Sequence, residues 1–151
     1  MDELALEFEL DSRLDNDCIT LGDFPLSRLL LMNDAQYPWF ILVPRRAEMS
    51  EIYHLSLADQ AQLLHESSFL AETIHDVFAA DKINIGAIGN MVNQLHIHHV
   101  VRYKGDAAWP APVWGAHPAK PYTAEQIEEI HRKLQLMMPP EVNFVTQDLI
   151  G

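Results

Sequence analysis

The chain of 151 residues is short of three things: cysteine, basic side chains and long apolar runs. Its single cysteine, Cys18, cannot form an internal disulfide, which fits a reducing, cytoplasmic setting. The neighbouring Asp15 and Asp17 would not stabilise a thiolate, so Cys18 is a poor candidate nucleophile. No apolar run approaches the length of a membrane span, and the N-terminal residues lack the basic start of a signal peptide. We therefore expect a cytoplasmic protein without a membrane partner.

The scarcity of basic residues bears on possible partners. Ten Lys and Arg stand against 22 Asp and Glu, a formal net charge of −12. A nucleic-acid backbone needs clustered positive charge, so nucleic acid is an unsuitable partner. Residues 1–25 hold eight acids and one base, whereas residues 82–104 hold three bases and no acid. The second stretch can accept an anionic small molecule despite the overall field, and burial of that stretch would explain its lack of acids equally well.

The remaining composition is ordinary for a globular protein, with 48% hydrophobic and 21% charged residues. A chain of this length is long enough to bury a sizeable core, and it shows no repeat, low-complexity tract or linker. We therefore expect one domain over residues 1–151.

Apolar runs bounded by turn residues predict strands. They lie at 26–32, 39–43, 83–89 and 94–102. The first two runs are joined by a polar turn, which suggests an antiparallel hairpin. Residues 1–18 are acidic with mixed apolar positions and predict a short strand or a loose helix.

Two helices are indicated by their caps and their apolar spacing. Ser56 is a candidate N-cap with Asp59 three residues later, and apolar residues then recur at helical spacing as far as Phe78. Thr123 with Gln126 begins a C-terminal helix, which residues 139–140 (Pro-Pro) close. Strands grouped around a few helices favour an α+β fold with an antiparallel sheet.

The stretch from Asn93 to Arg102 carries three of the eight histidines within four residues. It lacks Pro and Gly and is rich in β-branched residues, so it reads as a strand whose side chains alternate between two faces. One face would present a polar set: Gln94, His96, His98, Val100 and Arg102. The other would be a core face with one histidine: Leu95, Ile97, His99 and Val101.

Two histidines at i and i+2 on one face support three interpretations. His96 and His98 could share a Zn²⁺, which would need a third ligand such as His117 from the following loop. Alternatively, one imidazole is a nucleophile and its neighbour donates to a charged substrate, because neutral imidazole is abundant at pH 7. The third interpretation is structural: both histidines are satisfied within a polar sheet face.

This strand resembles the signature of the histidine-triad (HIT) superfamily, in which three histidines alternate with hydrophobic residues and an Arg often follows. Asn84-Ile85-Gly86 resembles the Asn-x-Gly that precedes the triad. Asn33-Asp34, followed by Ile41-Leu42-Val43-Pro44-Arg45, resembles the nucleotide-side hairpin. The loop from Ala108 to Gly115, which contains Trp109 and Trp114, resembles that of a bacterial subgroup.

The resemblance implies an HIT-like α+β fold, with a five-stranded antiparallel sheet, one long helix and one C-terminal helix. It also implies a nucleotide hydrolase or transferase similar to the diadenosine polyphosphate hydrolases. Such an enzyme cleaves a dinucleoside polyphosphate or a nucleoside phosphoramidate at the α-phosphate, through a covalent nucleotidyl-histidine intermediate. No metal or other cofactor is implied, and the protein would be a homodimer.

Carried onto this sequence, the resemblance makes His96 the nucleophile and His98 a donor to the phosphate or leaving group. Gln94, at the first triad position, would have a holding or orienting role. The substrate-binding residues would be Asn33 at the ribose, Asn90 near the phosphate, Asn84, and Arg102, which would lie farther along the same strand face and support the contacting residues.

The sequence departs from the pattern at two positions of the signature: Gln94 stands where the first triad histidine is expected, and His99, directly after the third triad residue, stands where an aliphatic residue is usual. Glutamine donates hydrogen bonds but carries no charge. Two alternatives therefore stay open, a nucleotide-binding module with little turnover and a metal-dependent enzyme using the His-x-His pair. Trp109 and Trp114 could stack on a base or cover the site, or they could pin their loop to the body or a partner subunit.

Overall fold

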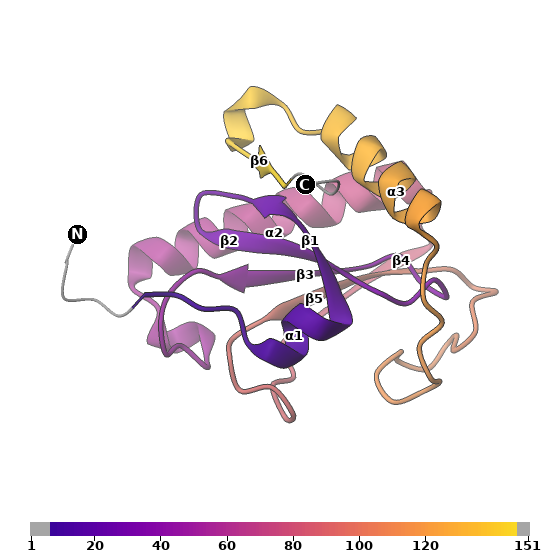
Figure 1. Ribbon diagram of the computed structural model, residues 1–151, viewed down its shortest axis with the longest axis horizontal. Coiled ribbons are helices and arrows are strands. Elements are labelled where there is room, and N and C mark those ends of the chain that lie inside the picture. Colours follow the sequence, from indigo (N-terminus) through magenta and orange to yellow (C-terminus); the bar gives the residue numbers. More distant parts are fainter. Residues whose placement is uncertain (1–6, 148–151) are drawn as a thin grey trace.

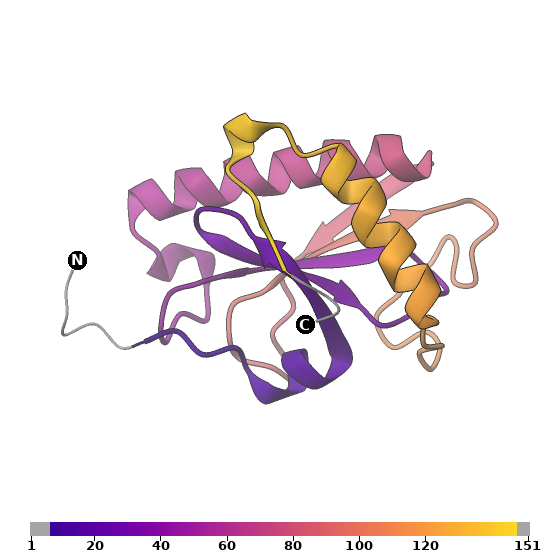
Figure 2. The ribbon, with the colours of Figure 1, turned by 45° about the horizontal axis from the view of Figure 1, so that its top comes forward.

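The computed structural model describes residues 7–147, which form a twisted antiparallel sheet with the two longer helices on one face (Figure 1). Figure 2 shows α2 and α3 together above the sheet, with α1 and the N-terminal segment below it. The strand order is β4-β5-β3-β2-β1-β6. In chain order the elements are α1 (Ser12–Asp17), β1 (Cys18–Asp23), β2 (Ser27–Met32), β3 (Trp39–Pro44), the 3₁₀ turn η1 (Ile52–His54), α2 (Leu57–Phe78), β4 (Lys82–Gly86), β5 (Ile97–Arg102), α3 (Ala124–Leu136), η2 (Pro140–Val142) and β6 (Val145–Thr146).

The predicted α+β class and antiparallel pairing are confirmed, but the predicted strand number is wrong: the sheet has six strands, not five. The additional edge strand, β6, has two residues and pairs with Gly22 and Asp23 of β1. Two residues are too few to show a hydrophobic periodicity in the sequence. Whether they pair with β1 depends on where the chain lies after α3. The helical alternative for the N-terminal region is correct over Ser12–Asp17, and residues 1–6 lie outside the described part of the chain.

The predicted caps begin both long helices. Ser56 Oγ accepts a hydrogen bond from Asp59 N at 3.1 Å, and Thr123 and Gln126 form a reciprocal capping box at the start of α3. Each cap satisfies backbone N–H groups that the first helical turn leaves unpaired, a contribution of about 1 kcal/mol. Cap spacing was therefore sufficient to place both helix starts.

The sheet separates two hydrophobic clusters. One lies between the sheet and helices α2 and α3, and the other lies on the opposite face beneath α1 and the loop after β5. Along β5, Ile97 and Val101 belong to the helix-side cluster and Val100 to the other. The predicted alternation is therefore confirmed from Ile97 onward, and it directs His98 and His99 to opposite faces.

Candidate active site

His96 and His98 are brought together on the sheet face opposite α2 and α3. Their ring centroids are 4.9 Å apart at an interplanar angle of 68°, and the residues are only 7% and 5% exposed. The predicted strand over 94–102 is too long, because β5 begins at Ile97. Leu95 N donates to Met49 O at 2.9 Å rather than to a neighbouring strand, so residues 94–96 lie outside the sheet and precede β5. The predicted pairing of the two imidazoles survives this change of backbone.

The hydrogen bond of His96 fixes which of its nitrogens is free. His96 Nδ1 lies 2.7 Å from the backbone carbonyl oxygen of Gln94, and a carbonyl oxygen only accepts. We therefore assign the proton to Nδ1, which leaves the lone pair of the neutral ring on Nε2. His96 Nε2 is thus the ring nitrogen that is left free to accept a hydrogen bond or to attack an electrophile.

His98 has the complementary tautomer. Trp39 Nε1–H donates to His98 Nδ1 at 2.9 Å, so the proton of the neutral ring is on Nε2. Burial, with smaller contributions from His96 and His99, lowers the pKa of His98 to about 3. His98 is therefore neutral near pH 7 and presents an Nε2–H donor beside the lone pair of His96. Sequence reasoning missed Trp39, because its role depends on the register between β3 and β5.

The Gln94 side chain is committed to the N-terminal arm, defined here as residues 7–13. Its Oε1 accepts from Asp11 N and its Nε2 donates to Glu9 O, both at 2.8 Å. A third bond, from Arg13 Nη1 to Met91 O at 2.8 Å, ties the arm to the segment before the histidines. Gln94 therefore serves His96 through its backbone carbonyl, while its amide holds the arm.

Arg102 is 1% exposed and uses all three guanidinium nitrogens within the protein. Nε and Nη2 bind the Asp106 carboxylate at 2.8 and 3.1 Å, and Nη2 also donates to Ala111 O. Nη1 donates to Asn84 Oδ1 at 2.7 Å. Although burial alone would raise it, hydrogen bonds from Arg102 and from backbone N–H groups lower the pKa of Asp106 to about 2. Arg102 and Asn84 thus hold the loop after β5.

Replacing Arg102 with alanine is expected to lower the free energy of unfolding by about 3–5 kcal/mol, because Asp106 would remain as a buried, unpaired carboxylate. Urea unfolding measures this loss. Arg132→Ala, which removes an exposed arginine of α3 paired with Glu129, is the matched control and should change stability by less than about 1 kcal/mol. A stable Arg102→Ala protein with weakened substrate binding would instead support the substrate contact predicted from the sequence.

The other two predicted substrate residues lie in different places. Asn90 is exposed in the turn after Gly89, within the segment between β4 and β5 that leads to the histidines. Asn33 follows β2, and its Oδ1 accepts from Tyr122 N at 2.9 Å. The structure therefore gathers Gln94, His96 and His98, with Asn90 in the adjoining segment, whereas Asn33 fastens the chain before α3.

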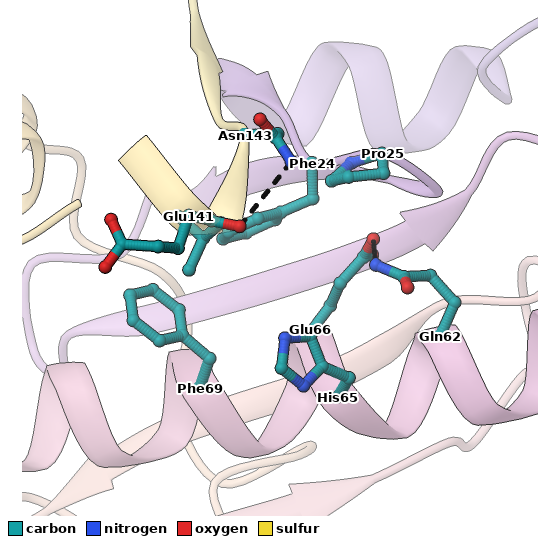
Figure 3. A pocket seen from close by; sticks show the side chains of 9 residues that line it. Phe24, Pro25, Gln62, His65, Glu66, Phe69, Glu141 and Asn143 are labelled. Carbon is teal, nitrogen blue, oxygen red and sulfur yellow. Dashed lines mark hydrogen bonds between the residues drawn. The ribbon is translucent and has the colours of Figure 1, made fainter. Parts of the chain in front are cut away.

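Two enclosed cavities lined by residues of the described chain are too small for a nucleotide, which takes a site of about 300–1,000 Å³. The cavity beside His96 measures about 30 Å³ and is lined by Gly89, Asn93 and Gln94 among others. A pocket of about 130 Å³ lies between α2, the β1–β2 turn and η2, where Glu66 and Phe69 face Phe24 (Figure 3). That pocket contains none of the predicted site residues.

Within residues 7–147, no group of three or more His, Cys, Asp or Glu side chains is arranged to hold a metal ion. His99 lies on the helix side, and its Nδ1–H donates to Ile97 O, so its Nε2 accepts from Ser67 Oγ–H at 2.7 Å. Burial lowers the pKa of His99 to about 4. Burial, then Asp17 and Asp15, raises the pKa of Cys18 to about 12, as expected for an unreactive thiol. None of the described helices is both long and apolar enough to cross a membrane.

Comparison with known proteins adds a family to this geometry. The family model of the HIT domain, which describes the sequences of that family, matches residues 13–105. A solved histidine-triad protein from Marinobacter aquaeolei VT8 is 51% identical, with a TM-score of 0.86, over 87% of this chain and 96% of that chain. Histidine-triad proteins from Bradyrhizobium japonicum and Sinorhizobium meliloti 1021 are 43% and 42% identical. Both have a TM-score of 0.85 over 87% of this chain, and cover 98% and 97% of theirs. A search of curated proteins found no match.

Proposed function

Because the chain belongs to the HIT-domain family, we propose that it is a cytoplasmic nucleotide hydrolase or transferase acting at an α-phosphate, through a covalent nucleotidyl-His96 intermediate. The substrate class is a dinucleoside polyphosphate or a nucleoside phosphoramidate. One observation carries the proposal: the two adjacent imidazoles have opposite tautomers, a free Nε2 lone pair on His96 and an Nε2–H on His98. This arrangement supplies a nucleophile and a neutral donor side by side.

The chemistry then proceeds in two displacements. His96 Nε2 attacks the α-phosphorus, and the leaving group departs with the bonding electron pair while His98 Nε2–H hydrogen-bonds to the developing charge. The resulting ring is positive, and the Gln94 carbonyl that accepts its Nδ1–H stabilises that charge. Water then attacks phosphorus, the P–N bond breaks, and a nucleoside monophosphate leaves as the proton passes to solvent. Another acceptor in place of water makes the reaction a transfer.

Asn90 is the predicted substrate residue best placed to reach a phosphate, because it lies exposed in the segment before the histidines. Asn33 stays a predicted ribose contact. Arg102 and Asn84 have their hydrogen bonds within the protein, so this proposal gives them no substrate contact.

A nucleotide-binding module with little turnover is the second candidate, and the Gln94 side chain favours it. At the first triad position that amide is bonded to the N-terminal arm. Steady-state assays with diadenosine tetraphosphate and with an adenosine phosphoramidate, each in the presence of a chelator, distinguish the candidates. We expect AMP to be released from at least one substrate. Tight nucleotide binding without release would favour the binding module, and activity only with added Zn²⁺ would favour the metal-dependent enzyme.

We also propose a homodimer formed through β4 and α2. β4 ends the strand order, and its exposed Ile85 lines a groove of about 560 Å³ with Leu57 and Leu64 of α2. An unpaired strand edge beside an apolar surface suits a second copy, because a two-fold axis lets the same patch cover itself.

Sedimentation equilibrium tests the dimer. Leu64→Lys places a charge in this groove and should raise the dimer dissociation constant at least about 100-fold, because a desolvated ammonium costs several kcal/mol. Glu72→Lys, at an exposed position of the same helix, is the matched control. A wild-type protein that sediments as a monomer would contradict the proposal.

A further inference from the structure

Trp114 lies against the two reactive histidines, although it belongs to the loop between β5 and α3. Its ring centroid is 5.3 Å from that of His98 at 74°, and 6.3 Å from that of Trp39 at 89°. It also lies over Gly86, the cross-strand partner of His98. A Cβ at Gly86 would be 3.5 Å from Trp114 Cη2 and 3.9 Å from Cζ2, which are ordinary van der Waals distances. The indole of Trp114 therefore packs directly against the backbone of β4 at Gly86.

The indole N–H of Trp114 has no hydrogen-bond partner in the described part of the chain. Nε1 is shut off from solvent, and no acceptor among residues 7–147 lies within hydrogen-bond reach. A buried donor left unpaired costs about 1–3 kcal/mol, so an acceptor arriving here gains that energy. Trp39, by contrast, has its own N–H bonded to His98. Trp114 therefore holds a donor beside the histidines that the folded protein does not use.

The amide nearest to the nucleophile in sequence is already engaged. Both ends of the Gln94 side chain are bonded to the backbone of Glu9 and Asp11, which holds the amide on the arm and engages its oxygen and one of its two N–H groups. His98 Nε2–H is then the one imidazole donor, while phosphoryl transfer spreads charge over several oxygens. The indole N–H of Trp114 is a buried donor that can serve a second oxygen.

We propose that Trp114 is a substrate-contacting residue whose Nε1–H donates to a nonbridging oxygen of the phosphoryl group under attack. The inference rests on the proposed function and names a residue that the triad strand does not contain. Trp114 and His98 then form a pair of neutral donors on one phosphate. Because Trp114 is itself half-exposed, a shift of its loop away from Gly86 admits the phosphate to the N–H.

The loop that carries Trp114 is anchored at its start. Asp106 accepts from the backbone N–H groups of Ala108 and Trp109, and its carboxylate is held by Arg102. Val113, directly before the indole, is buried in the cluster on this face. Gly115, directly after it, has φ +75°, a conformation that glycine adopts without strain. Trp114 is thus positioned by fixed neighbours on one side and a glycine on the other.

The experiment is an NMR titration of the indole N–H signals of the whole protein, labelled with ¹⁵N. The chain has three tryptophans, so Trp39→Phe and Trp109→Phe assign the Trp114 signal by elimination. We expect AMP to shift the Trp114 indole proton downfield as it gains a charged acceptor, and adenosine, which lacks the phosphate, to leave it in place. Trp114→Phe should weaken AMP binding about tenfold, the loss of one hydrogen bond to a charged group, without changing adenosine binding.

Trp109→Phe is the matched control. The Trp109 ring centroid lies 5.5 Å from Cζ of Arg102, and loss of this contact should leave AMP affinity unchanged. If wild-type protein turns over substrate and binds AMP while the Trp114 signal stays fixed, the inference is wrong and the proposed function stands. If wild-type protein neither binds AMP nor turns over substrate, both are wrong. The titration uses unaltered protein, so it decides the matter even if Trp114→Phe does not fold.

Discussion

His96→Ala is expected to lower kcat for nucleotide cleavage by at least about 10⁴-fold, because it removes the atom that forms the covalent intermediate. His96 precedes β5, and its ring hydrogen bond is to a backbone carbonyl two residues away, so its loss should leave the sheet pairing intact. Initial rates at saturating substrate measure the effect, and thermal unfolding checks the fold.

His117→Ala is the matched control, since His117 lies exposed in the loop after β5 and bonds only to Ala107 O among the described residues. It should retain wild-type kcat. Full activity in His96→Ala would show that His96 is not the nucleophile. A comparable loss in His117→Ala would favour the metal-dependent alternative, in which that residue is the third ligand.

Lowering the pH below 6.5 should destabilise the protein at pH values that are still above those at which carboxylates ordinarily titrate. The pKa values of His98 and His99 are lowered from 6.5 to about 3 and about 4, both chiefly by burial. Between pH 6.5 and about 4, these two histidines are therefore protonated in the unfolded chain and neutral in the native state. Stability is full above pH 6.5 and falls with pH, by roughly 2–3 kcal/mol per pH unit near pH 5 for two histidines.

Urea unfolding at pH values from 4.5 to 7.5 measures this slope. A His99→Leu variant should show about half of the wild-type slope, whatever its absolute stability, because only one buried histidine then takes up a proton on unfolding. His75→Ala, which removes an exposed histidine, should keep the wild-type slope. A free energy of unfolding that is flat from pH 7 to pH 5 would contradict the burial of neutral imidazoles on which the tautomer assignment depends.

What the sequence could predict was local. Helix starts at Ser56 and Thr123 follow from caps within four residues, and the meeting of His96 with His98 follows from their spacing. Features that depend on distant segments were not accessible. Trp39 reaches His98 through the register of β3 on β5, and Gln94 is drawn to an arm more than 80 residues away. The motif therefore predicted that the two histidines meet, but not which groups fix their tautomers.

The most direct test of the central claim is to trap the intermediate. Wild-type protein is mixed with adenosine-labelled substrate and quenched during turnover in alkaline denaturant, which preserves a P–N bond, and the label is then mapped by peptide mass spectrometry. The account predicts one adenylyl group, on His96. Turnover without any covalent adenylate, or a label on a residue other than His96, would contradict it.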